Sequence, residues 1–226
     1  MRTSVIIPVL DEERVIGERL VELEALGVDE IIVVDGGSRD GTRAAVARRP
    51  RVRWMSAQRG RAWQMNAGAN VATGEVLVFL HADVSLPSDA LAHIQRALAD
   101  RRVAAGAFRT WTVPDRPTRL GFLLHLADLR SRYSKLPYGD QAPFVRAEVF
   151  RALGGFPPIP LMEDLALSQR LRTVGRTKIV PANVRVSGRR FMRSPIFYTS
   201  VVNLFPALYR LGVSPTFLAR FYGAVR

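Results

Sequence analysis

The sequence predicts an α/β fold with a central, mostly parallel sheet and helices on both faces of that sheet. Short runs rich in Val and Ile alternate with segments of helical periodicity, which is the pattern of parallel strands joined by helices. The runs are apolar at nearly every position, as expected for strands that are buried on both faces. With 226 residues, 48% of them apolar, the chain is long enough for one large domain with a sizeable core.

Residues 4–9 form the first predicted strand, because a β-branched run there is bounded by the acidic residues Asp11 to Glu13. Apolar residues then recur at helical spacing from Arg14 to Gly27, and glycine commonly ends helices. The same alternation predicts further strands at residues 30–35, 52–56 and 76–80 and helices at residues 42–49 and 61–72.

The second half of the chain is less regular. It predicts a helix at residues 88–100, a strand at 103–113, a loop at 114–117 and a helix at 120–132. A loop around Gly139, a strand and helix that lead into Phe156, and a helix that starts near Glu163 follow. We interpret residues 191–226 as an appended helical tail, and we find no internal repeat and no long linker.

Basic residues outnumber acidic ones by 33 to 20, but the charge is unevenly distributed. Residues 1–50 hold seven basic and ten acidic residues, whereas the stretch from Leu165 to Arg226 holds eleven basic residues and no acidic one. Such a field attracts nucleic acid, an anionic membrane surface or a diphosphate, and charge alone does not choose among them. A general preference for arginine, with 31 Arg to two Lys, explains the excess equally well.

Several classes of site are excluded or unsupported. The chain has no cysteine, so disulfides, thiol catalysis and cysteine-bound zinc are excluded, and a metal would need oxygen or imidazole ligands. Neither G-x-G-x-x-G after the first strand nor the phosphate-binding loop G-x-x-x-x-G-K-[ST] occurs. We find no signal peptide and no apolar run of about 20 residues, and we therefore expect a cytoplasmic protein.

Acidic residues follow three of the predicted strands, at Asp11, Asp35 and Asp83. Because the carboxyl ends of parallel strands meet at one edge of a sheet, we expect these carboxylates on a common rim, where ligands bind. Carboxylates of this kind suit Mg²⁺ or Mn²⁺ bound to a diphosphate. Asp83 is the best candidate because it follows the most apolar strand, and His81 beside it is either a ligand or a structural side chain.

Each candidate also has a structural interpretation. Asp83 could cap the turn that follows it, and Asp35 could bind its own Asp-Gly turn instead of a ribose or a base. Glu163 and Asp164 are either acids favoured at a helix N-terminus or a pair that supplies a general base. Residues 139–141 are either an ordinary turn or part of a substrate pocket.

Taken together, a series of short motifs resembles family-2 glycosyltransferases over about residues 4–176. In order, they are Pro8-Val9-Leu10-Asp11-Glu12, Val33 to Thr42, Gly60-Arg61-Ala62, Asn66-Ala67-Gly68, Gly74-Glu75, Phe79-Leu80-His81-Ala82-Asp83, Gly154-Gly155-Phe156 and Met162-Glu163-Asp164. Each motif is weak alone, but the ordered set is specific. The resemblance implies a GT-A-like domain at residues 1–190 that transfers a sugar from a UDP- or GDP-linked donor to an acceptor hydroxyl, with inversion and with Mg²⁺ or Mn²⁺.

The resemblance also implies site residues. Those that would bind the nucleotide sugar are Pro8, Val9, Leu10, Glu12, Asp35, Gly36, Arg61, His81, Ala82 and Asp83. Among them, Asp35 would contact the base, Arg61 the base or the phosphates, and Asp83 the metal. Two positions depart from the family pattern, because His81 replaces the first acid of the D-x-D motif and Gly36 replaces the acid usual after the second strand.

By the same resemblance, Asp164, with Glu163 beside it, is the general base that deprotonates the acceptor hydroxyl. The residues that would shape the acceptor or sugar pocket are Gly139, Asp140, Gln141 and Arg190. Arg190 could also hold the diphosphate through two parallel hydrogen bonds, which a lysine could not copy.

The tail carries apolar residues at helical spacing together with Arg210 and Arg220. Such a stripe is most often a core or a dimer contact. In a segment without acids it could also lie on an anionic bilayer, at the inner face of the membrane and near a lipid-linked acceptor. We expect the tail to pack on the domain or to lie at a membrane surface or an oligomer interface.

Two other functions fit parts of the sequence. A nucleic-acid-binding protein would explain the net charge of +13, but the basic residues are not interleaved with aromatic ones, so no specific nucleic acid partner is expected. A sugar-nucleotide pyrophosphorylase needs a glycine-rich basic loop after its first strand, where Asp11-Glu12-Glu13 stands instead. The alternative that stays open is a basic α/β protein that binds nucleic acid or anionic membranes without transferase activity.

Overall fold

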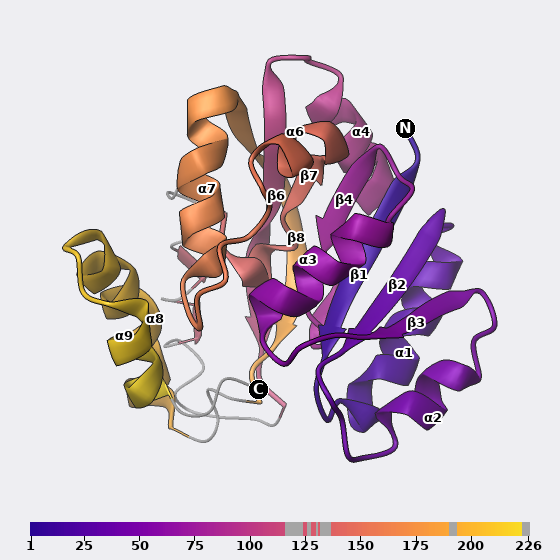
Figure 1. Cartoon of the computed structure of the whole chain (residues 1–226), viewed down its shortest axis with the longest axis horizontal. Coiled ribbons are helices and arrows are strands. Elements are labelled where there is room, and N and C mark those ends of the chain that lie inside the picture. Colours follow the sequence, from indigo (N-terminus) through magenta and orange to yellow (C-terminus); the bar gives the residue numbers. More distant parts are fainter. Residues whose placement is uncertain (116–123, 126–127, 130, 132–136, 190–193, 223–226) are drawn as a thin grey trace.

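The computed structural model describes residues 1–115, 124–125, 128–129, 131, 137–189 and 194–222, and in these ranges the strands form one curled sheet (Figure 1). The strand order is β3-β2-β1-β4-β7-β6-β8-β5. The strands are β1 (Thr3–Val9), β2 (Glu30–Asp35), β3 (Val52–Ser56), β4 (Val76–Phe79), β5 (Val84–Ser85), β6 (Val103–Val113), β7 (Phe144–Arg146) and β8 (Arg176–Ser187).

The first four strands form the parallel half of the sheet, as predicted. β1 pairs with both β2 and β4, and β3 lies outside β2. The chain therefore runs from β1 outward to β3 and then crosses back to the other side of β1. Ligands of open α/β sheets bind where the strand order reverses in this way, at the carboxyl ends of the strands. In this sheet that point lies between the ends of β1 and β4.

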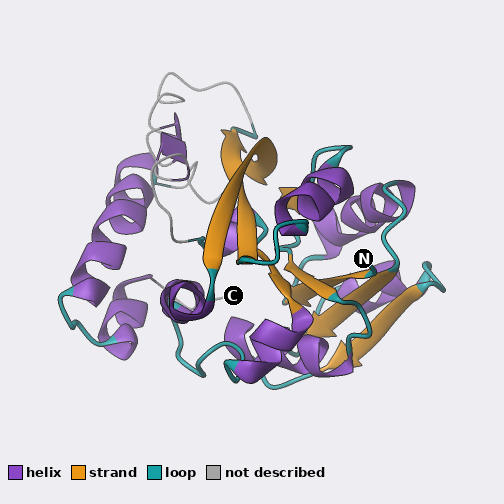
Figure 2. Ribbon diagram, turned by 90° about the horizontal axis from the view of Figure 1, so that it is seen from above, coloured by secondary structure: helices purple, strands orange, loops and turns teal. Residues whose placement is uncertain are grey.

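Helices cover both faces of the sheet (Figure 2). They are α1 (Glu13–Ala25), α2 (Thr42–Ala47), α3 (Arg61–Val71), α4 (Ala90–Leu98), α6 (Ala147–Ala152), α7 (Glu163–Val174), α8 (Pro195–Arg210) and α9 (Pro215–Tyr222), with a short 3₁₀ helix at Gly139–Gln141. Because side chains alternate along a strand, Val5 and Ile7 of β1 pack in the core layer of α1, α2 and α4. Ile6 packs in the opposite layer, with α3, α6 and α7.

Helix α3 lies unusually close to the sheet because its contact residue is Gly68. A Cβ atom at this position would lie 2.5 Å from the side chain of Ile6 on β1. This close approach is the physical reason for the glycine in the Asn66-Ala67-Gly68 motif. It also fixes the N-terminus of α3, with Arg61, beside the ends of β1 and β4.

The second half of the sheet is mixed, and two of its strands were not predicted. β7 runs antiparallel to β4 and β6, whereas β8 pairs in parallel with β6 along most of its length. Sequence patterns missed β8 because Pro181 and several charged residues interrupt it, and they missed β5 because it has only two residues. The helix predicted at residues 120–132 lies largely outside the described residues.

The tail contains two helices, α8 and α9, which lie at one side of the molecule (Figure 1). Val201, Phe205 and Leu218 are buried and pack around Leu161, in the loop before α7. In the described ranges, no helix has both the length and the apolar character needed to cross a bilayer.

Candidate active site

A crevice opens where β1 and β4 end side by side, at the predicted edge of the sheet. Its lining residues are Pro8, Val9, Leu10, Glu12, Arg61, Gln64, His81, Ala82 and Asp83. The sequence pointed to all of these except Gln64. The structure therefore brings most of the expected nucleotide-binding residues together, whereas Asp35 and Gly36 lie outside this lining.

The Gln64 side chain packs directly against Gly36. The buried Gln64 amide donates to the backbone carbonyl oxygens of Val9 and Val34, each at 2.8 Å. A Cβ atom at Gly36 would lie about 3.0 Å from this amide. The side chain of the usual acid at position 36 would therefore crowd Gln64, which would have to shift by a few tenths of an ångström. The sequence signal for Gln64 was a polar residue on the buried face of a predicted helix.

Asp35 is buried at the end of β2, where its carboxylate accepts hydrogen bonds from the turn that follows. The Gly37 and Ser38 backbone N–H groups donate to it at 3.0–3.2 Å, and the Ser38 hydroxyl also donates. These contacts match the structural interpretation, in which Asp35 holds its own Asp-Gly turn. Contact between Asp35 and a base stays a prediction.

Arg189 contacts both carboxylates that line the crevice, those of Glu12 and Asp83. Its Nη2 atom lies 2.5 Å from Glu12 Oε2 and 3.7 Å from Asp83 Oδ2. Arg189 lies two residues after the end of β8, and β8 is tied to the crevice because the Ser187 N–H donates to the Asp83 carbonyl oxygen. The unpredicted strand thus places a cation beside Asp83. Arg190, the residue predicted for this part, lies outside the described residues.

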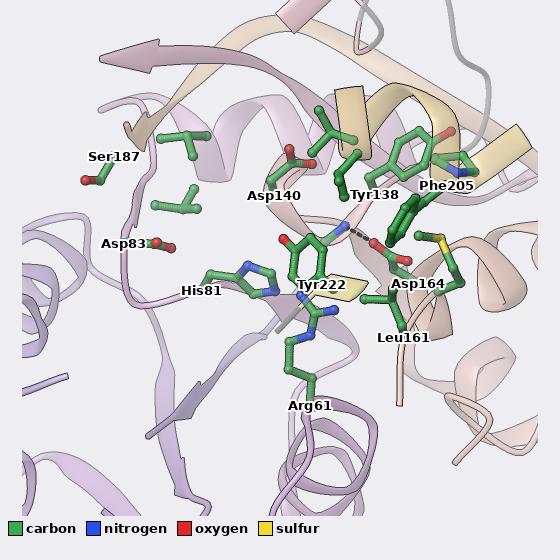
Figure 3. Close-up of a pocket in the computed structure, with 17 residues that line it drawn as sticks. Arg61, His81, Asp83, Tyr138, Asp140, Leu161, Asp164, Ser187, Phe205 and Tyr222 are labelled. Carbon is green, nitrogen blue, oxygen red and sulfur yellow. Dashed lines mark hydrogen bonds between the residues drawn. The ribbon is translucent and has the colours of Figure 1, made fainter. Parts of the chain in front are cut away.

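A second cavity adjoins the crevice, and the two share Arg61, His81 and Asp83 in their linings. In Figure 3, side chains from both halves of the chain surround this cavity. Gly139, Asp140 and Asp164 contribute the polar part of the wall, and α8 and α9 contribute an apolar part. The larger cavity therefore begins where the crevice ends.

Asp164 is held in a fixed position at the start of α7. Its Oδ2 atom accepts a hydrogen bond of 2.6 Å from the Gly139 N–H (Figure 3). Its Oδ1 atom accepts one of 2.7 Å from the Leu165 N–H. Gly139 also packs against His81, since a Cβ atom there would lie 3.0 Å from the imidazole and 3.4 Å from Asp164. Gly139 thus lets the imidazole and the carboxylate approach each other.

Two residues of the predicted acceptor pocket, Gly139 and Asp140, line the cavity, but Gln141 does not. The Gln141 side chain is buried, where it accepts from the Tyr138 N–H and donates to the Phe108 carbonyl oxygen. Its amide is thus engaged by the backbone. Gln141 holds the 3₁₀ turn against β6, which is a correction of its predicted place in the pocket.

A buried ion pair lies between the two cavities. Arg61 Nε is 2.9 Å from Glu163 Oε1, and the Glu163 side chain is only 2% exposed. Among the described residues, the other Glu163 oxygen has no hydrogen-bond partner. Burial raises the pKa of Glu163 to about 7, although Arg61 acts in the opposite direction. Burial therefore favours the protonated form of Glu163 to higher pH in the folded protein than in the unfolded chain.

No group of three His, Asp or Glu side chains in the described ranges is placed to hold a metal ion alone. Mg²⁺ and Mn²⁺ are commonly bound by one or two carboxylates together with substrate phosphates. Asp83 lines both cavities, and Glu12 contacts the same arginine. These residues fit a metal that arrives with a diphosphate.

The sequence profile of Glycosyl transferase family 2 matches residues 4–153, which is more than half of the chain. The chain belongs to glycosyl transferase family 2. This range contains the whole crevice lining and ends before Asp164. No curated protein matches the chain in sequence.

Solved glycosyltransferases share the fold of this family-2 chain. The mannosyltransferase PcManGT from Pyrobaculum calidifontis, in complex with GDP-Man and Mn²⁺, has a TM-score of 0.66 and 26% identity, over 92% of this chain and 64% of that one. S. aureus TarS 1–349 in complex with UDP-GlcNAc has a TM-score of 0.65 and 19% identity, over 83% and 58%. Our chain thus spans less than two thirds of either protein.

The Glu163 pKa predicts how the stability of this family-2 chain depends on pH. Between the ordinary value of 4.5 and about 7, folded Glu163 keeps a proton that the unfolded chain has released. The free energy of unfolding should therefore fall as pH rises through this window. The glutamine side chain of Glu163→Gln cannot ionise. The free energy of unfolding of this variant, relative to that of wild type, should therefore increase by up to about 3 kcal/mol between pH 5 and pH 8.

Urea unfolding at both pH values measures this difference. The control is Glu148→Gln, an exposed acid on α6, which should follow the wild-type pH dependence. An unchanged pH dependence in Glu163→Gln would show that Glu163 is ionised throughout this range.

Proposed function

We propose that the protein is an inverting glycosyltransferase that moves a sugar from a UDP- or GDP-linked donor to an acceptor hydroxyl. The observation that carries this proposal is the junction of the crevice and the cavity at Arg61, His81 and Asp83, with Asp164 in the wall of the cavity. A donor in the crevice would point its sugar into the cavity. The family match and the nucleotide sugars held by PcManGT and TarS support the donor class.

The donor diphosphate would lie beside Asp83, Glu12 and Arg189. A divalent metal bound there with the diphosphate would neutralise the negative charge that develops on the leaving group. Arg189 would contribute a second positive charge, because its guanidinium already lies beside two carboxylates of the crevice lining and keeps its charge at any physiological pH. The Arg61 guanidinium borders both cavities and would contact the phosphates from the other side.

Asp164 would act as the general base. The hydrogen bonds from Gly139 and Leu165 fix its orientation, so that the carboxylate can take the proton of an acceptor hydroxyl that attacks the anomeric carbon. Attack from the side opposite the diphosphate inverts the configuration at that carbon. Glu163 would hold Arg61 in place, since its side chain is buried behind the cavity wall.

The acceptor would carry its hydroxyl on a molecule with an apolar part. Val201, Phe205 and Tyr222 contribute apolar surface to the cavity, and the 3₁₀ turn contributes polar residues. An apolar wall beside a general base suits an amphiphilic acceptor better than a free sugar. We include in the proposal a lipid-linked acceptor that is reached from a membrane surface.

Calorimetry with UDP, GDP and ADP, each with and without Mn²⁺, tests the donor class and the metal. We expect one nucleotide to bind with micromolar affinity, which corresponds to about 8 kcal/mol, and to bind more tightly with Mn²⁺. Asp83→Ala should remove the effect of Mn²⁺ and leave the metal-free affinity nearly unchanged. Failure of all three nucleotides to bind would overturn the proposal, and an unchanged Mn²⁺ effect in Asp83→Ala would remove Asp83 from the metal site.

Asp164→Asn tests the general-base role of Asp164 separately from nucleotide binding. Asn keeps an oxygen that accepts from Gly139, so the turn should stay in place, but the amide cannot take a proton. Transfer, measured as release of the nucleotide diphosphate, should fall by a factor of about 100 or more, with nucleotide affinity within a few-fold of wild type. Retained transfer, or loss of nucleotide binding, would exclude the base role.

Arg189→Ala tests the cation that the unpredicted strand β8 brings to the crevice. Loss of a charge-assisted contact to the diphosphate should weaken metal-free nucleotide binding about tenfold, and Arg189→Lys should recover part of it. Arg185→Ala is the matched control, because Arg185 is an exposed arginine on the same strand. Equal affinities for Arg189→Ala and Arg185→Ala would show that Arg189 does not contact the nucleotide.

A further inference from the structure

The two C-terminal helices and the loop between them, residues 195–222, expose an unusual number of large apolar side chains; we call this segment the C-terminal hairpin. The exposed side chains, with 44–81% of their surface accessible, are Phe197, Leu204, Leu211, Phe217 and Phe221. In the rest of the described chain, exposed apolar side chains are scattered over several elements. Apolar side chains gathered in so short a segment mark an interaction surface.

The spacing of these residues places them beside the buried stripe of each helix. Phe197, Leu204 and Leu211 are seven residues apart, so they share one side of α8 and its end. Phe217 and Phe221 are four residues apart on α9, and their ring centroids are 5.0 Å apart. Since Val201, Phe205 and Leu218 already hold the hairpin on the domain, these five exposed side chains are not needed for that packing.

The charge of the hairpin identifies its partner. Arg210 and Arg220 are both exposed, and the chain from Leu165 to Arg226 has no acidic residue to pair with them. A second copy of the hairpin would bring arginines against arginines. Anionic lipid headgroups would instead neutralise them, while the acyl region accepts the phenylalanine and leucine side chains. We propose that the C-terminal hairpin docks the protein on an anionic lipid bilayer.

Docking through this hairpin would also bring the catalytic cavity to the membrane. The same two helices expose Leu204 and Phe217 to solvent and turn Val201, Phe205 and Tyr222 toward the cavity. A lipid-linked acceptor could then present its hydroxyl to Asp164 while its lipid stays in the bilayer. This last step rests on the proposed transferase function, whereas docking itself does not.

Sedimentation of the full chain with vesicles tests the docking. The vesicles are phosphatidylcholine alone or with about 30 mol% phosphatidylglycerol, because basic residues bind anionic surfaces. Wild type should bind the anionic vesicles, and binding should weaken as salt is raised. Phe217→Ser/Phe221→Ser and Arg210→Gln/Arg220→Gln should each lower the partition coefficient about tenfold.

Matched variants control for general loss of apolar surface or charge. Val21→Ser/Val174→Ser removes exposed apolar side chains from α1 and α7, and Arg43→Gln/Arg48→Gln removes exposed arginines on and beside α2. The apolar control should bind as wild type, and the arginine control should bind more tightly than Arg210→Gln/Arg220→Gln. Circular dichroism and nucleotide binding show that each variant is folded, so a failure of docking stays separate from a failure of the donor site.

Several results would overturn the proposal. These are equal binding to neutral and anionic vesicles, no binding to either, or full binding by the hairpin variants. A stable dimer in lipid-free solution that Phe217→Ser/Phe221→Ser dissociates would instead assign the surface to a second copy of the chain.

Discussion

The buried ion pair between Arg61 and Glu163 joins the two halves of the molecule at the point where its cavities meet. Arg61 begins α3 in the parallel half of the sheet, and Glu163 begins α7 in the mixed half. A buried pair of this kind adds little net stability, because desolvation of both charges offsets their attraction. Its value here is positional, since it ties Arg61 in the crevice lining to the residue that precedes Asp164.

The positions that depart from the family pattern each have a partner that accommodates them. Gly36 leaves room for the Gln64 amide, which binds the backbone of β1 and β2. His81 packs against Gly139, whose N–H in turn holds Asp164. The crevice therefore carries less negative charge than two further acids would give it. Arg189 offsets part of the remaining charge, on Glu12 and Asp83.

The mixed half of the sheet and the tail supply a cation and apolar side chains to the site. β8 runs beside β6 and brings Arg189 to the crevice from a part of the chain more than a hundred residues after Asp83. The tail that follows contributes the apolar wall of the cavity. The carboxylates at the strand ends, the arginine beside them and the apolar wall of the cavity thus come from three separate parts of the sequence.

The sequence by itself determined the α/β class, the strands of the parallel half and most of the crevice lining. The class and the strands follow from local patterns, because a buried strand is apolar along its length. Most of the crevice lining follows instead from the ordered motifs that resemble family-2 glycosyltransferases. Only the tertiary structure decided that Gln141 binds backbone groups, that Gln64 occupies the space beside Gly36, and that Arg189 reaches Asp83. The physical reason is that hydrogen bonds and ion pairs between distant residues depend on strand pairing, and β8, with its proline and charges, carries no local signal of where it pairs.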